Sequence, residues 1–281
     1  MIRLPKKNRT SHHCTLIPVM GHLTRNLRQH FKIKAYTQNT EVAVFGDGFA
    51  IPNNNLPTMI NSGDEDDPFP VDDCLFAETF SQETVYRLLG EELKIRQLFG
   101  ANLGVAAPVW DAALHLCCYF EEQSVQLRGK RIIELGAGTG VVGILAARLG
   151  AVVTLTDLPL ALSQLQANVC ANTPSSGWPT SVPTVLPLSW GEDHVNFPSD
   201  WDLVLCADII YLPDTYPLLI ETLVHLCKNG AVLYLSSKMR KEHRTACFYE
   251  EFLPSRFNVE LVKRDDKQNI NIYRASLRKE Q

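Results

Sequence analysis

The stretch Ile132-Ile-Glu-Leu-Gly-Ala-Gly-Thr-Gly140 decides the fold of this chain. Its apolar run ends in an acid and is followed by three alternating glycines, which allow a tight turn and a close approach of backbone N–H groups to a ligand. A helical pattern follows over 141–149, with Gly150 placed to cap its end, and residues 151–157 are a second strand pattern that ends in an acid. This order predicts half of a nucleotide-binding α/β fold.

Strand and helix patterns alternate around this unit. Further strands are predicted over 182–188, 201–207 and 231–237, and further helices over 110–122, 158–172 and 216–227. The alternation predicts a Rossmann-like, mostly parallel sheet with helices on both faces. Segments 258–263 and 269–275 alternate apolar and polar residues with no helix between them, so an antiparallel hairpin should complete a seven-stranded sheet. A shorter hairpin is predicted over 84–97, turning at 90–92.

The composition is that of an ordinary soluble protein. Of the 281 residues, 45% are hydrophobic and 21% are charged, and the length suits one large α/β domain. No apolar run reaches the roughly 18 residues of a membrane-spanning helix, so no membrane partner is expected. The eight cysteines include no C-x-x-C pair and several lie in apolar patterns. We therefore expect no metal site, no disulfides and a reducing compartment.

The amino-terminal part differs from the rest. Residues 1–34 carry eight lysines and arginines and no acid, so a whole-chain charge of −4 leaves −12 for the remainder. An acidic remainder argues against nucleic acid as a partner, since phosphate binding needs a basic face. Residues 1–70 are predicted to be a basic, poorly ordered extension with an acidic linker, ahead of a catalytic domain over 71–281. A mitochondrial import peptide and a basic docking arm remain alternatives.

The glycines alone do not decide the ligand. Gly138-Thr-Gly-Val-Val-Gly143 satisfies the G-x-G-x-x-G pattern of dinucleotide sites, and Asp157 follows 19 residues after Gly138. An NAD-dependent oxidoreductase is therefore an alternative. Glu134, two residues ahead of Gly136, favours S-adenosylmethionine, because a carboxylate beside the positive end of a helix disfavours a pyrophosphate there.

The fourth strand pattern ends in Asp208-Ile-Ile-Tyr211, at the sheet edge where ligands gather. An acid and a tyrosine three residues apart can both face a reacting centre, so Asp208 and Tyr211 are the candidate catalytic residues. Trp110 precedes the glycine turn and Trp190 follows the third strand, and either ring can stack on adenine or lie near a sulfonium cation. Packing of these two rings, and a helix cap by Glu134, are the structural alternatives.

Four segments resemble the methyltransferase-like 21 group of seven-strand protein lysine methyltransferases, namely 103–113, 134–143, 189–191 and 207–212. The resemblance extends over about residues 75–278, and a closing antiparallel hairpin is typical of these enzymes. It implies S-adenosyl-L-methionine as the cofactor. The candidate cofactor-binding residues are then Trp110, Glu134, Gly136, Ala137, Gly138, Gly140, Asp157, Trp190 and Ala207.

The same resemblance indicates the methyl acceptor. Nucleobase amino-methyltransferases carry prolines between the acid and the aromatic ring of 208–211, and the isoleucines found here imply a protein lysine in place of a flipped base. Segments 157–162, 237–243 and 269–274 are similar to members that act on elongation factor 1-alpha, which implies that substrate and a cytoplasmic or centrosomal location. A non-catalytic binding protein of the same fold is a further alternative, and no pattern predicts an oligomeric state.

The expected reaction transfers a methyl group to a lysine ε-nitrogen, with the protein mainly supplying position. Asp208 is expected to orient the amine and Tyr211 to align it. Asp157 should accept hydrogen bonds from the ribose hydroxyls, while the glycine turn should donate N–H groups to the methionine carboxylate. A basic loop over 238–244 is either a substrate contact or a solvated loop.

Overall fold

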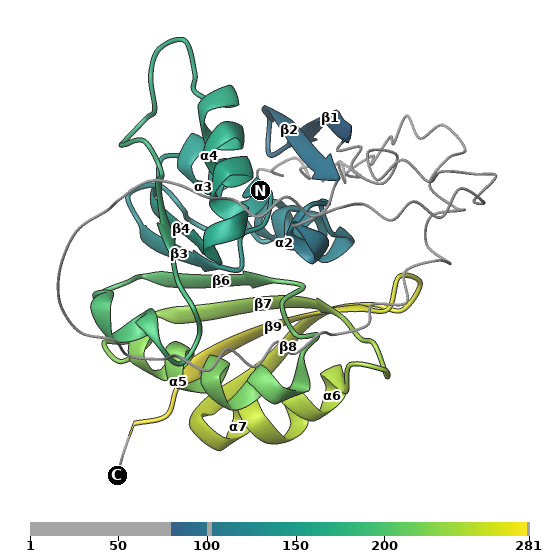
Figure 1. The fold of residues 1–281 in the computed structure, drawn as a ribbon. Coiled ribbons are helices and arrows are strands. Elements are labelled where there is room, and N and C mark those ends of the chain that lie inside the picture. The colour runs from purple at the N-terminus through teal and green to yellow at the C-terminus, as the bar shows by residue number, and fades with distance from the viewer. Residues whose placement is uncertain (1–79, 100–102, 280–281) are drawn as a thin grey trace, which may run out of the picture. The chain divides into compact units, whose positions relative to one another are not determined.

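A computed structural model describes residues 80–99 and 103–279 (Figure 1). The predicted extension over 1–70 lies outside these residues, so its order and role remain predictions. In the described part, no helix has the length and apolarity needed to cross a membrane.

A seven-stranded sheet, in the order β5-β4-β3-β6-β7-β9-β8, forms the centre of the domain (Figure 1). Its strands are β3 (Arg131–Leu135), β4 (Val152–Asp157), β5 (Thr184–Pro187), β6 (Leu203–Ala207), β7 (Val232–Lys238), β8 (Phe257–Asp265) and β9 (Ile270–Leu277). Strands β3 to β7 pair in parallel, whereas β9 runs antiparallel between β7 and β8. The predicted mostly parallel sheet with a closing hairpin is confirmed, and every strand lies within two residues of its predicted bounds.

Helices cover both faces of the sheet, as predicted (Figure 1). They are α2 (Asp111–Glu122), α3 (Val141–Arg148), α4 (Leu162–Ala171), α5 (Tyr216–Leu226), α6 (Thr245–Cys247) and α7 (Leu253–Arg256), with a π-helical turn over Phe248–Phe252. Alternate strand residues face opposite cores. Ile132 and Leu205 pack with α2, α3 and α4, whereas Ile133 and Cys206 pack with α5, α7 and the π-helical turn. The helix predicted over 158–172 is split, because Pro159 begins a separate 3-10 turn ahead of α4.

The predicted amino-terminal hairpin is also present. Strands β1 (Phe80–Leu88) and β2 (Glu91–Phe99) pair antiparallel around a turn at Leu89-Gly90, one to two residues earlier than predicted. Both turn residues have positive φ, 48° and 77°, which suits a two-residue hairpin turn.

A row of amide side chains attaches this hairpin to α4. Gln164, Asn168 and Asn172 are spaced four residues apart, so they lie on one face of the helix. Asn168 accepts the N–H of Arg96 and donates to its carbonyl, both at 2.9 Å, and Asn172 makes the same pair of bonds with Lys94. Gln164 accepts from Leu98 and donates to the carbonyl of Ala106. The row thus satisfies the outer edge of β2 and holds the segment that leads to α2.

Candidate active site

The glycine turn follows β3, and its three glycines have positive φ values of 61° (Gly136), 55° (Gly138) and 81° (Gly140). Space also favours glycine, since a Cβ on Gly136 would lie 2.7 Å from Ile209 Cγ2 and one on Gly140 would require Leu165 Cδ1 to move. The turn therefore presents bare backbone at the carboxyl edge of the sheet, where ligands bind in folds of this type.

The N–H groups of this turn are bound within the protein. Ala137 donates to the carbonyl of Thr156 at 2.9 Å, and Gly140 donates to the carbonyl of Ala137 at 2.7 Å. The N–H of Gly138 donates to Asp157 Oδ2 at 2.7 Å. The expected donation from the turn to a methionine carboxylate remains a prediction.

Asp157, the last residue of β4, lies against the turn. Its Oδ2 accepts from Gly138, and its Oδ1 accepts from the N–H of Leu158 at 2.7 Å. Burial raises the pKa of Asp157, while the hydrogen bonds from Gly138 and Leu158 lower it in part. Each carboxylate oxygen has two acceptor positions, so both oxygens retain one for a ligand.

Glu134 lies beneath the turn and is buried. Its Oε2 accepts the N–H of Gly143, in the first turn of α3, at 2.8 Å. Burial raises the pKa of Glu134 from 4.5 to about 8; the bond from Gly143 lowers it, and the charge of Asp157 raises it further. Glu134 thus caps α3, which was the structural alternative from the sequence, and a direct cofactor contact remains a prediction.

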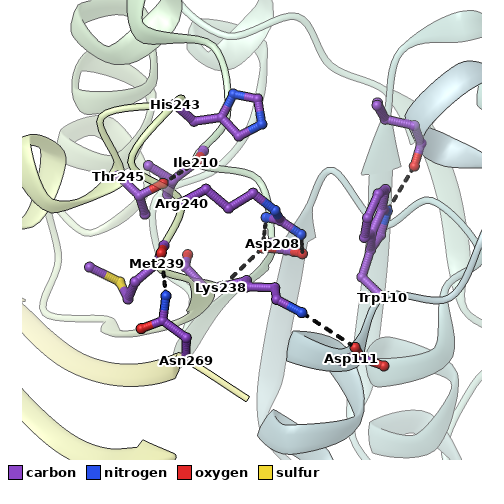
Figure 2. A network of polar contacts seen from close by, with 12 residues as sticks. Trp110, Asp111, Asp208, Ile210, Lys238, Met239, Arg240, His243, Thr245 and Asn269 are labelled. Atoms are coloured by element: carbon purple, nitrogen blue, oxygen red, sulfur yellow. Dashed lines mark hydrogen bonds and ion pairs between the residues drawn. The ribbon is translucent and has the colours of Figure 1, made fainter. Parts of the chain in front are cut away.

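Asp208 follows β6 and stands in the left-handed region at φ 57°, which aspartate tolerates better than most residues. Its N–H donates to the carbonyl of Ser236 on β7 at 2.7 Å. Arg240 donates to both carboxylate oxygens, at 2.8 Å to Oδ1 and 2.9 Å to Oδ2, and the N–H of Lys238 donates to Oδ1 at 3.1 Å (Figure 2). The side chain of Asp208 is 3% exposed, so the candidate catalytic acid is one half of a bidentate, mostly buried ion pair.

No sequence pattern identified Arg240 as the partner of Asp208. Arg240 belongs to the basic loop over 238–244, which was interpreted as a substrate contact or a solvated loop. Two of its cations make ion pairs within the protein: Arg240 with Asp208, and Lys238 with Asp111 at 3.9 Å (Figure 2). A contact of the loop with substrate remains a prediction. The cluster of basic residues was the available signal, but it did not identify the acid that each residue would meet.

Trp110 precedes α2, and its ring faces this ion pair (Figure 2). Its Nε1 donates to the carbonyl of Val105 at 2.8 Å. The guanidinium carbon of Arg240 lies 5.3 Å from the centroid of the ring, within the range of a cation–π contact. The ring is not a core anchor, because Trp110 is 36% exposed.

The remaining candidates line the same sheet edge. Trp190 lies beside the glycine turn, with its Cζ2 3.7 Å from the position of a Cβ on Gly136. Ala207 ends β6 and pairs with Ser236 of β7. The ring of Tyr211 contacts the ring of His243 edge-on at 6.5 Å between centroids, and burial, assisted by the charge of Asp157, raises the pKa of its phenol. Within residues 80–99 and 103–279, no cluster of three or more His, Cys, Asp or Glu side chains is arranged to hold a metal ion.

A family model described as lysine methyltransferase matches residues 88–252. The chain belongs to the lysine methyltransferase family. Two relatives of this lysine methyltransferase are named EEF1A lysine methyltransferase 3. The protein from Xenopus tropicalis is 57% identical, over 72% of this chain and 88% of the relative. The protein from Mus musculus is 54% identical, over 74% of this chain and 88% of the relative. The protein N-lysine methyltransferase METTL21A of Mus musculus is 46% identical, with 66% and 84% covered.

A solved structure supports the fold of this lysine methyltransferase. The 16S rRNA N2 G1207 methyltransferase of T. thermophilus, in complex with AdoMet and guanosine, matches with a TM-score of 0.52 at 20% identity, over 70% of this chain and 51% of that chain. The predicted family and enzyme class, a protein-lysine methyltransferase, are confirmed. The NAD-dependent oxidoreductase is therefore set aside, and S-adenosylmethionine is the cofactor.

Proposed function

We propose that this lysine methyltransferase transfers a methyl group from S-adenosylmethionine to a lysine of elongation factor 1-alpha. The observation that carries this proposal is the identity of 57% and 54% to two relatives named for that substrate, over 88% of each relative's length. Three relatives named METTL21A share 41–50% identity with the chain. We place this protein in the cytoplasm, with the centrosome as an alternative location, and expect its substrate to be a protein.

The residues at the carboxyl edge of the sheet fit the cofactor. The cradle formed by Gly136 and Gly138 excludes a Cβ at Gly136, and both oxygens of Asp157 retain an acceptor position for ribose hydroxyls. Trp190 presents aromatic surface beside the turn, and the ring of Trp110, which is 36% exposed, presents another beside Arg240. When bound, S-adenosylmethionine supplies an activated methyl group whose bond to sulfur breaks as the bond to the lysine nitrogen forms.

Asp208 and Tyr211 would orient the lysine that accepts the methyl group. Asp208 directly follows β6, the strand that pairs with β3 ahead of the glycine turn. A hydrogen bond from the ε-amine to its carboxylate would direct the nitrogen lone pair toward the cofactor. Tyr211, whose ring is supported by His243, provides a wall for the lysine side chain. The nitrogen must be neutral to attack, since an ammonium has no lone pair. We assign residues 71–281 to this catalytic domain and leave 1–70 as an extension outside it.

Incubation of the full chain with recombinant elongation factor 1-alpha and methyl-labelled cofactor tests the proposal. We expect label on one or more lysines, located by mass spectrometry, and loss of at least 100-fold in rate for Asp208→Asn. Elongation factor 1-alpha from cells that lack this protein should lose the same methylation. Label on other lysate proteins with none on elongation factor 1-alpha would overturn the substrate assignment, and no label on any protein would favour the non-catalytic alternative.

A further inference from the structure

The carboxylate of Asp208 has almost no free acceptor capacity. A carboxylate offers about four acceptor positions. On Oδ1, Arg240 Nη1 and the N–H of Lys238 use two of them, and on Oδ2, Arg240 Nη2 uses a third. One position on Oδ2 therefore remains for a lysine amine, and its direction is set by the carboxylate plane that Arg240 holds.

Arg240 is itself held in place. Its two terminal nitrogens each donate to one oxygen of Asp208, and its guanidinium carbon lies 5.3 Å from the centroid of the Trp110 ring. The Arg240 side chain is 18% exposed, so water screens the pair weakly. A guanidinium suits this place better than an ammonium, because its planar fork matches a carboxylate and its face stacks on an aromatic ring.

The pair changes the charge that an incoming lysine meets. A lone carboxylate stabilises the ammonium form of a neighbouring lysine and so raises its pKa, which opposes the attack. When Arg240 lies against the carboxylate, the two opposite charges largely cancel at the position of the lysine. The remaining acceptor on Oδ2 can still take an N–H from the neutral amine.

The other ionisable groups around Asp208 alter this balance little. Tyr249 of the π-helical turn interacts with the charge of Asp208, but burial raises the pKa of its phenol well above the usual value, so it stays neutral. Lys238 of β7 is paired with Asp111 of α2 at 3.9 Å, which forms a second ion pair of no net charge. His243 faces Tyr211, and the charge of Asp157 acts on the phenol of Tyr211 from the cofactor side. Arg240 is thus the cation in direct contact with the candidate catalytic carboxylate.

We propose that Arg240 is the positioning residue of the methyl-acceptor site: it orients Asp208 to accept one hydrogen bond from the lysine, and it neutralises the carboxylate so that the lysine binds as the neutral amine. This inference rests on the proposed role of Asp208 in lysine methylation. Arg240 itself does not contact the transferred methyl group.

The test is the pH dependence of kcat, which reports ionisations in the enzyme–substrate complex. In Arg240→Gln, the uncompensated carboxylate should raise the pKa of the bound lysine, so the rising limb of the profile should move up by about one pH unit. Arg240→Lys keeps the positive charge but loses the two-pronged contact of the guanidinium with the carboxylate. The rising limb of its pH profile should therefore stay in place, while kcat should fall at least tenfold. Lys228→Gln is a control: Lys228 is exposed and precedes the amino end of β7, whereas Arg240 follows the carboxyl end. Its pH profile and kcat should match those of wild type.

An Arg240→Gln profile that superimposes on the wild-type profile after scaling would overturn the electrostatic part of the proposal. A second measurement does not depend on activity. In urea unfolding, Asp208→Asn and Arg240→Gln should lower the midpoint, and the double variant should lose less than the sum of the two losses. Additive losses would overturn the pairing. If the wild-type chain does not modify elongation factor 1-alpha, the proposed substrate is contradicted. The unfolding comparison still tests the Asp208–Arg240 pair, because it needs no substrate.

Discussion

The N–H of Gly138 donates a hydrogen bond to Asp157 Oδ2 at 2.7 Å, across 19 residues of sequence. The acid that ends β4 therefore holds the glycine turn that follows β3. Asp157 thus shapes the turn from within the protein, and we propose that it also offers its remaining acceptor positions to the cofactor.

Asp157→Ala should weaken cofactor binding by about 10- to 100-fold, because it leaves the N–H groups of Gly138 and Leu158 without their partner and removes both ribose acceptors. Titration calorimetry with S-adenosylhomocysteine measures the change. Asp200→Ala is a control, since Asp200 is exposed and pairs with Arg131 at the start of β3, the end of the strand opposite the glycine turn. An unchanged dissociation constant for Asp157→Ala would refute its role as a cofactor ligand.

Glu134→Gln should flatten the pH dependence of stability. The folded-state pKa of about 8 lies above the ordinary value of 4.5, so the folded protein binds a proton that the unfolded chain releases. The stabilisation is full below pH 4.5 and is lost as the pH rises through about 8. The amide oxygen of glutamine can still accept the N–H of Gly143 without carrying a charge.

Urea unfolding of wild type and Glu134→Gln at several pH values from 5 to 8.5 measures this effect. Relative to the variant, wild type should lose free energy of unfolding as the pH rises. A constant difference between the two proteins across this range would show that Glu134 does not titrate there.

Gly136→Ala should destabilise the fold through two effects, a positive φ and a steric clash. The new Cβ would lie 2.7 Å from Ile209 Cγ2. Gly177→Ala is a matched control, since Gly177 has a φ of 79° but no atom within 4 Å of the Cβ position. We expect about 1 kcal/mol of lost stability for Gly177→Ala and about 2–4 kcal/mol for Gly136→Ala. Equal losses in thermal unfolding would mean that strain alone requires glycine at position 136.

Asn168→Ala should loosen the β1–β2 hairpin. Asn168 satisfies the N–H and the carbonyl of Arg96 and also donates to the carbonyl of Thr139, so its loss leaves three backbone groups unpaired. We expect a loss of about 2–4 kcal/mol in the free energy of unfolding and faster amide hydrogen exchange in β2. Gln166→Ala, exposed on the same helix, should change neither. Unchanged exchange in β2 for Asn168→Ala would argue that other contacts hold the hairpin.

The order of the elements could be predicted from the sequence because each prediction rests on a local pattern. The apolar run over 132–135 and the glycines after it indicate a buried strand and a tight turn without any knowledge of their neighbours. The period-two patterns over 258–263 and 269–275 likewise predicted the closing hairpin. Gly150, with a φ of 93°, ends α3 as predicted.

The partners of the site residues could not be predicted in the same way. Asp208 was recognised from its place after a strand, but its contact with Arg240 spans 32 residues and depends on how the loop after β7 folds back. The amide row of α4 reaches a hairpin 66–78 residues earlier in the chain. Sequence periodicity records which side of an element is buried, and it contains no information about which distant group will satisfy a buried charge or amide.

The sequence by itself thus determined the sheet, the glycine turn and the acids placed at its edge, since backbone sterics and apolar burial act over a few residues. The tertiary structure decided what those acids do. In the folded chain, Glu134 accepts the N–H of Gly143 in α3, Asp157 accepts the N–H of Gly138 in the turn, and Asp208 pairs with Arg240. A carboxylate in a low-dielectric site takes its chemical character from the donors packed against it, and those donors come together when the chain folds.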